Sequence, residues 1–123
     1  MADILKDLYA IVEQRKAQGE EGSYTAYLFE KGLDKILKKI AEETGETIIA
    51  AKSLEAATER KDGFAGIEVL KDEFAGEIAD LLYHLVVLQS ALGVDVEKVE
   101  SVLKERSGKT GNLKSQKIVD KNT

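Results

Sequence analysis

The sequence predicts an all-α protein, built as a helical bundle. Proline is absent from all 123 residues, and the chain is rich in alanine, leucine, glutamate and lysine, which favour helices. Apolar residues recur every three or four positions in several long segments, and no segment shows the strict alternation typical of strands. A hydrophobic content of 43% over this length is enough for one domain with a modest core and too little to expect two.

The first predicted helix begins after Asp3, which can cap its N-terminus, and ends at Gly19. Its apolar residues share one face: Ile4, Leu5, Leu8, Ile11 and Val12. A loop over residues 20–23 follows, and residues 24–31 are predicted to form one or two helical turns before Gly32.

A long second helix is predicted from residue 33 to about residue 57. Its apolar positions recur at helical spacing and are Leu33, Ile36, Leu37, Ile40, Ile48 and Ala51. At about 100° per residue, Glu43 falls inside this apolar arc, whereas Lys39 and Glu46 border it. Glu42 points outward.

The charged residues 59–63 are interpreted as a connection, and residues 64–70 as either a loop or a short helix. A third long helix is predicted over residues 72–92, with an apolar face formed by Phe74, Ile78, Leu81, Leu82, Leu85, Leu88 and Leu92. A polar stripe follows its flank: Glu73, Glu77, Asp80 and His84. Residues 81–92 are apolar nearly all round, which one small monomer would struggle to cover, so the sequence predicts an oligomer.

Gly93 ends this helix, and Asp95 can cap a last one that carries Val96, Val99, Val102 and Leu103. The remaining residues, 107–123, form a polar tail that we expect to be disordered without ligand, and its lysines are Lys109, Lys114, Lys117 and Lys121. The predicted organisation is therefore one domain over residues 1–106 followed by this tail.

Composition excludes several classes of function. The chain has no cysteine, so it has no disulfide framework, zinc thiolate site or thiol nucleophile. A net charge of -5 argues against non-specific nucleic-acid binding, which depends on a basic surface. No apolar run approaches the roughly 20 residues that span a membrane. We therefore expect a soluble, cytoplasmic protein without nucleic-acid or membrane partners.

Two acidic pairs at helical spacing, Glu43 with Glu46 and Glu77 with Asp80, are the most informative feature. Residues three apart lie on the same side of a helix, so two such helices packed together bring four carboxylates to one point. Carboxylates facing a core need a cation, because an unpaired charge there costs several kcal/mol. The pattern favours a Mg²⁺ site for a phosphorylated substrate.

Each pair alone would usually be an ordinary solvated surface, and the two together leave that interpretation and the metal site equally open. His84 lies one turn beyond Asp80, where a lone histidine is more often a structural hydrogen-bonding partner than a metal ligand. Lys39 shares the flank of the first pair and is the best candidate for a phosphate contact. The hydroxyls that precede this helix either bind ribose or phosphate or act as helix caps, and they belong to Ser23, Tyr24 and Thr25.

The sequence around these acidic pairs resembles that of a known family. Residues 22–40, with Glu42, Glu43 and Glu46 after them, closely resemble the phosphoribosyl-ATP pyrophosphohydrolase family of histidine biosynthesis. Residues 77–85 resemble the second sequence block of that family. The resemblance covers most of residues 5–106, and the ordered Ser-Tyr-Thr-Ala block distinguishes this family within the all-α NTP pyrophosphohydrolase (MazG-like) superfamily.

The resemblance implies an Mg²⁺-dependent hydrolysis of 1-(5-phosphoribosyl)-ATP to 1-(5-phosphoribosyl)-AMP and pyrophosphate. It implies the superfamily's helical bundle, completed by dimerisation as a homodimer or an assembly of dimers. The metal-binding acids of the superfamily fall on Glu43, Glu46, Glu77 and Asp80. Glu42 would be an outer or water-orienting acid, and Lys39 with Lys35 would offset the charge of the triphosphate.

Two alternatives stay open from the sequence. The first is an enzyme that hydrolyses ordinary or damaged nucleoside triphosphates by the same chemistry, since the acidic motifs are shared across the superfamily. The second is a non-catalytic helical dimerisation module whose acids form a solvated stripe. The hydroxyl-rich block around residues 23–27 separates the first from the phosphoribosyl-ATP enzyme, and Mg²⁺-dependent stabilisation argues against the second.

Overall fold

The computed structural model describes residues 3–19 and 21–108. Over these residues the fold is entirely helical, with no strand, and the all-α prediction is confirmed. The five helices are α1 (Ile4–Gln18), α2 (Tyr24–Lys31), α3 (Leu33–Glu59), α4 (Phe64–Ala91) and α5 (Val96–Ser107). Helix α5 extends to Ser107, the first residue assigned to the predicted tail, and Gly108 is its C-cap. The rest of the tail, residues 109–123, lies outside the described residues.

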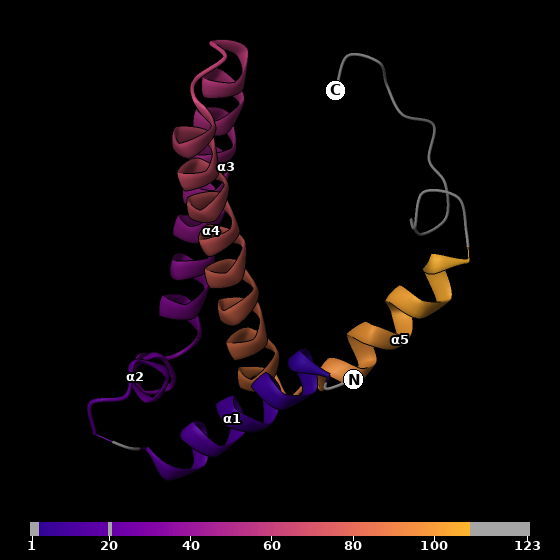
Figure 1. The fold of residues 1–123 in the computed structure, drawn as a ribbon. Helices are drawn as coiled ribbons and strands as arrows, with labels where there is room; N and C mark the ends of the chain where they lie inside the picture. The colour runs from indigo at the N-terminus through magenta and orange to yellow at the C-terminus, as the bar shows by residue number, and fades with distance from the viewer. Residues whose placement is uncertain (1–2, 20, 109–123) are drawn as a thin grey trace.

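The two long helices α3 and α4 form an antiparallel hairpin, and the shorter helices gather at one end of it (Figure 1). There α1 crosses α4, α2 precedes the start of α3, and α5 extends from the end of α4 beside α1. The core lies at this end and consists of Val12, Leu28, Ile36, Val86, Val87 and Val96. The opposite half of the hairpin projects away from the three short helices (Figure 1).

Side-chain caps begin three helices where the sequence places short polar residues. Asp3, Ser23 and Asp95 each accept a hydrogen bond from a backbone N–H in the first turn that follows. Gly19 closes α1 with a left-handed φ of 57°, a conformation that glycine adopts without steric cost. The predictions for Asp3, Gly19 and Asp95 are therefore confirmed, and Ser23 takes the capping role that the sequence left open.

The α3–α4 hairpin is longer than predicted at its tip. Helix α3 continues to Glu59, and α4 begins at Phe64 rather than at residue 72, so only residues 60–63 connect them. Apolar periodicity could not reveal this first part of α4, because Phe64 is 80% exposed and Val69 is 55% exposed in the monomer. The segment lies apart from the core cluster, and its apolar residues Ile67 and Leu70 are half-buried.

The apolar faces are partly misassigned by spacing alone. On α1, Val12 is fully buried, whereas Ile4 at the helix start is 73% exposed. On α4, the valines Val86 and Val87 form the core, and Leu82 is exposed. The reason is geometric, since α1 crosses α4 over only a short stretch and this crossing decides which apolar residues are covered.

Helices α3 and α4 contain 27 and 28 residues, which is long enough to cross a bilayer. Within residues 3–19 and 21–108, however, no single helix combines such a length with a sufficiently apolar composition. Only α4 and α5 taken together reach that composition, and they are bent by 117° relative to each other.

Candidate active site between helices α3 and α4

The two acidic pairs meet across the α3–α4 hairpin. Glu43 on α3 and the pair Glu77 and Asp80 on α4 each place one carboxylate oxygen within 4.8 Å of the other two. Glu46 interacts with the side chains of both Glu43 and Glu77. The antiparallel packing of the two helices thus brings together the four carboxylates that helical spacing predicted to converge.

These acids lie at the edge of the contact between the helices. Glu43 is 7% exposed, Glu77 is half-buried, and Glu46 and Asp80 are exposed, so the cluster runs from the interior to the surface. Thr47 marks the contact at this level, because its hydroxyl donates to the carbonyl oxygen of Glu43 at 2.8 Å and lies 3.4 Å from that of Glu77. Glu43 occupies the position inside the apolar arc that the sequence predicts.

The electrostatics of the cluster are unfavourable without a cation. Burial, followed by the negative charge of Glu46, raises the pKa of Glu43. Burial and a hydrogen bond with Glu46 raise the pKa of Glu77. In the described part of the chain, one buried oxygen of each, Glu43 Oε2 and Glu77 Oε2, has no hydrogen-bond partner. Orphaned buried carboxylate oxygens are costly and are ligands that Mg²⁺ prefers, so this donor set fits a divalent cation.

The cluster opens onto a groove of about 500 Å³. Three of the four acids line it, with Glu73 one turn before Glu77, and the other lining residues are Ile49, Ala50, Ser53 and Gly76. This volume lies in the range of small-molecule sites, and the opening gives a polyphosphate access to the carboxylates.

Lys39 stands beside the cluster, as its position on the helical wheel predicts. Its ammonium lies 3.1 Å from Glu42 Oε2 and 3.8 Å from Glu43 Oε1, so it pairs mainly with the outer acid. A hydrogen bond with Lys39 lowers the pKa of Glu42, and the positive charges of Lys39, Lys38 and Lys35 add to this effect. Lys35 therefore acts at the outer edge of the site, one turn away from Lys39.

Helix α2 contacts the acidic cluster through Tyr24 and His84. The Tyr24 hydroxyl lies 2.8 Å from His84 Nε2, and His84 Nδ1 lies 2.7 Å from the carbonyl oxygen of Asp80. A carbonyl oxygen only accepts, so Nδ1–H donates to it, and Nε2 forms the hydrogen bond with the Tyr24 hydroxyl. His84 is buried between these partners, which confirms the expected structural role and connects α2 to Asp80.

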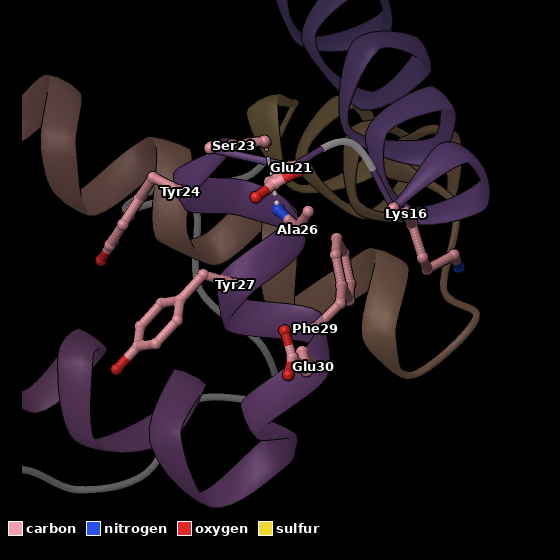
Figure 2. A pocket seen from close by; sticks show the side chains of 10 residues that line it. Lys16, Glu21, Ser23, Tyr24, Ala26, Tyr27, Phe29 and Glu30 are labelled. Atoms are coloured by element: carbon pink, nitrogen blue, oxygen red, sulfur yellow. Dashed lines mark hydrogen bonds between the residues drawn. The ribbon is translucent and has the colours of Figure 1, made fainter.

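A second hollow, of about 830 Å³, lies between α1 and α2 (Figure 2). Figure 2 shows the rings of Tyr24 and Tyr27 extending to one side of α2, with Phe29 and Lys16 on the other. The two tyrosine rings stack with centroids 6.3 Å apart, and the Lys16 ammonium lies 5.7 Å from the centre of the Phe29 ring. The hollow thus offers aromatic surface near the acidic cluster. Tyr24 lines the hollow and also interacts with Glu43 of the cluster.

Sequence reasoning missed two polar residues at this end of the molecule, Tyr83 and Arg15. The buried Thr25 hydroxyl hydrogen-bonds with the Tyr83 hydroxyl, and Arg15 Nη1 donates to the same hydroxyl at 3.1 Å. Tyr83 and Arg15 are 68 positions apart, so no spacing pattern connects them. The one available signal was a tyrosine hydroxyl inside an otherwise apolar segment of α4. A buried hydroxyl of that kind needs a hydrogen-bond partner.

Comparison with known proteins shows to which family the chain belongs. The sequence model of the family described as phosphoribosyl-ATP pyrophosphohydrolase (PRA-PH) matches residues 5–107. The chain is 44% identical over 117 residues to the phosphoribosyl-ATP pyrophosphatase of Listeria welshimeri, a match that covers 95% of this chain and 98% of that protein. It is 41% identical over 115 residues to the protein of the same name from Clostridium novyi, covering 94% and 91% of the two chains. The phosphoribosyl-ATP pyrophosphatase of Streptococcus sanguinis is 44% identical over 117 residues, covering 95% and 98%. The chain therefore belongs to the phosphoribosyl-ATP pyrophosphohydrolase family.

Proposed function

We propose that this protein hydrolyses 1-(5-phosphoribosyl)-ATP to 1-(5-phosphoribosyl)-AMP and pyrophosphate in L-histidine biosynthesis, with Mg²⁺ held between α3 and α4. Family membership supports the reaction. The main support for the metal site is that carboxylate oxygens of Glu43, Glu77 and Asp80 lie within 4.8 Å of one another. Glu43 and Glu77 each have a buried oxygen without a hydrogen-bond partner among the described residues. A solvated acidic stripe would not bury such oxygens, which argues against the dimerisation module.

Glu43, Glu77 and Asp80 would hold the ion, and Glu46, which interacts with two of them, would complete the set. When bound, Mg²⁺ would neutralise phosphate charge and make an attacking water more acidic. The half-buried Glu77 and buried Glu43 place the donor oxygens against the core, where the positions of the side chains are restricted by packing. The exposed Asp80 and Glu46 border the groove through which the triphosphate enters.

Lys39 and Glu42 supply a cation and a base at the other side of Glu43. In the structure these two side chains form an ion pair at 3.1 Å. A triphosphate at the cluster would compete for the Lys39 ammonium, and loss of that ammonium raises the proton affinity of Glu42. Glu42 then accepts the proton of the water that attacks phosphorus at the α–β linkage, and pyrophosphate leaves with the electron pair of the broken P–O bond. Lys35 adds positive charge at this edge.

The direct test of the proposed function is pyrophosphate release from phosphoribosyl-ATP, measured beside a panel of ordinary NTPs and dNTPs, with and without Mg²⁺. We expect kcat/KM for phosphoribosyl-ATP to exceed that for ATP by about 10³-fold or more, since a site built for the whole substrate loses specific contacts when half of it is missing. Removal of Mg²⁺ should abolish release. Equal rates with plain nucleotides would instead identify a general nucleotide pyrophosphohydrolase, and no release from any substrate would contradict enzymatic function.

We also propose that two copies of the chain assemble through the projecting half of the α3–α4 hairpin. In the monomer this half exposes large apolar side chains that no other described helix covers, namely Ile48, Ile49, Phe64 and Val69. Large apolar side chains exposed in this way are typical of association sites. Ile49 lines the groove beside Glu46, so a partner hairpin on this surface would border the candidate active site.

Replacing Ile48 with lysine is expected to convert this assembly to a monomer at micromolar concentration. The Ile48 side chain is 59% exposed within one chain, so the substitution leaves the monomer core intact but places a charge in the proposed interface. Sedimentation equilibrium measures the mass, and circular dichroism verifies the helices. The matched control is Gln14→Lys, which adds the same charge at an exposed polar position of α1, at the other end of the molecule from the projecting half of the hairpin. A wild-type chain that sediments as a monomer contradicts the proposed assembly.

A further inference from the structure

We propose that Arg15 binds the single phosphate on the second ribose of the substrate and is therefore a determinant of specificity for phosphoribosyl-ATP over ATP. This inference rests on the proposed function, because it concerns the end of the substrate that ATP lacks. Phosphoribosyl-ATP carries negative charge at two ends, a triphosphate and a monophosphate. The carboxylate cluster serves the first end, so the second requires a separate group of cationic and hydroxyl donors.

A hollow of about 510 Å³ lies next to Arg15 and is distinct from the groove at the carboxylates. Its polar lining includes the side chains of Arg15, Ser23, Thr25 and Tyr83, and Tyr24 forms part of the wall. Hydroxyl groups and a guanidinium are the side-chain donors that bind phosphate oxygens, and arginine binds them through two parallel N–H groups. Glu21 at the rim is the one described acidic residue in this lining.

Arg15 has donors available for a ligand. Over residues 3–19 and 21–108 its guanidinium forms no ion pair, and its recorded hydrogen bond is the one from Nη1 to the Tyr83 hydroxyl. A guanidinium has five N–H groups, so most of them remain unused. The neighbouring Lys16 differs in this respect, since its ammonium is held by the Glu13 carboxylate at 2.7 Å and by the Ser90 carbonyl oxygen at 2.9 Å. The ammonium of Lys16 is therefore held by two partners within the protein, whereas most N–H groups of Arg15 remain available to a ligand.

The anchor of Arg15 is rigid. Tyr83 lies on α4, and its hydroxyl is hydrogen-bonded to that of Thr25, which is 1% exposed and belongs to α2. The hydroxyl that positions the guanidinium is therefore fixed by two helices packed around the core. Such a support reduces the entropy that is lost when the guanidinium binds an anion.

Two residues, Tyr24 and His84, connect the hollow to the carboxylate cluster. The Tyr24 side chain lines the hollow, and its hydroxyl binds His84, whose ring in turn binds the carbonyl oxygen of Asp80. A substrate with its triphosphate at the carboxylates therefore passes Tyr24 to reach Arg15. The stacked rings of Tyr24 and Tyr27 present aromatic surface beside this path (Figure 2), where a purine can pack.

The test compares Arg15→Met with the wild-type protein on two ligands. For phosphoribosyl-ATP with saturating Mg²⁺, we expect KM to rise by about 10- to 100-fold with kcat changed less than about threefold, because the lost contact is made equally in the ground and transition states. ATP, used as a competitive inhibitor, should retain its inhibition constant, since it has no second ribose phosphate. Arg15→Lys, which keeps the charge but not the paired N–H groups, should give an intermediate KM.

The matched control is Arg60→Met, which removes the same charge from an exposed site at the tip of the hairpin, where Arg60 pairs with Asp62 at 2.9 Å. An unchanged KM in Arg15→Met overturns the inference, and so does equal weakening of phosphoribosyl-ATP and ATP. If Arg15→Met does not fold, as judged by circular dichroism, Arg15→Lys takes its place. A raised KM for phosphoribosyl-ATP with an unchanged inhibition constant for ATP then supports the inference, and an unchanged KM overturns it. Failure of the wild-type protein to release pyrophosphate would contradict the proposed function itself, which separates the two failures.

Discussion

Replacing Glu43 with glutamine is expected to lower kcat for pyrophosphate release by about 10²- to 10³-fold while leaving the protein folded. Glutamine has nearly the same shape but no charge, so it keeps the packing on α3 and removes an oxygen ligand from the proposed cation site. The side chain is 7% exposed, and its Oε2 has no partner among the described residues, so an amide there does not break an existing hydrogen bond to that oxygen.

The same substitution is expected to stabilise the metal-free protein at neutral pH. Burial and the charge of Glu46 raise the pKa of Glu43 in the folded state above its ordinary value of 4.5, so the charged form is disfavoured by folding. Stability therefore falls as the pH rises from that ordinary value through the raised one, and Glu43→Gln removes this loss. Thermal melting of both proteins without Mg²⁺ at pH 5 and pH 8 measures the difference.

The control for Glu43→Gln is Glu55→Gln on the same helix, because Glu55 is exposed and its one ion pair among the described residues is with Lys52 on the surface. It should change neither turnover nor stability measurably, as expected for a surface ion pair. Asp80→Asn, at the exposed side of the cluster, should lose activity like Glu43→Gln. Wild-type turnover in both Glu43→Gln and Asp80→Asn at saturating Mg²⁺ would show that these acids do not hold the ion.

Mg²⁺ is expected to raise the melting temperature by about 5–10 °C when present at a hundredfold excess over its dissociation constant. A ligand that binds only the folded state at this excess stabilises it by about 2.7 kcal/mol, and a domain of this size shifts by several degrees per kcal/mol. The physical source is the cost of burying these carboxylates together with the repulsion among Glu43, Glu46, Glu77 and Asp80. Burial first, and the neighbouring acids second, raise the pKa of Glu43 and Glu77, and a bound cation offsets both effects.

The raised pKa values of Glu43 and Glu77 also determine how stability changes with pH. These raised values make a contribution that lowers the stability of the metal-free protein as the pH rises above 4.5, the ordinary value of both groups. The increase in melting temperature produced by Mg²⁺ grows over the same range, because the ion binds the deprotonated acids. Differential scanning calorimetry from pH 5 to pH 8, with and without Mg²⁺ at constant ionic strength, measures both. A melting temperature that does not change when Mg²⁺ is added would contradict a site at these carboxylates. An increase in melting temperature that is equally large in Glu43→Gln would contradict it as well.

Helical spacing was sufficient to predict the acidic cluster. Glu43 lies inside the apolar arc of its helix and Glu46 borders it, while Glu77 and Asp80 lie on the flank of the next long helix. Two long helices joined by a short connection pack with those arcs together. The position of Glu43 inside the arc and of Glu42 outside it follows from the same count, and the structure places both accordingly. Local periodicity carries this information because it depends only on neighbours in the sequence.

The start of α4 shows the limit of that reasoning. In the helix that starts at Phe64, Phe64 and Val69 are exposed in one chain while Ile67 and Leu70 are half-buried, so their spacing gave no recognisable buried face. The roles of the hydroxyl block were equally undetermined. Ser23 caps α2, Thr25 binds Tyr83, and Tyr24 binds His84, three different partners for three consecutive residues. Short-range preferences cannot distinguish among these partners, because two of them are about 60 positions away.

By itself, the sequence determined the helical class, the caps that begin α1 and α5, and the two acidic pairs with the family to which they belong. Only the tertiary structure decided that Glu43, Glu77 and Asp80 meet within 4.8 Å, and that Arg15 reaches Tyr83. The reason is physical. Helix periodicity is set by local backbone geometry, whereas contacts between distant residues depend on how α1, α2 and α4 cross, and a crossing is fixed by the packing of the whole core.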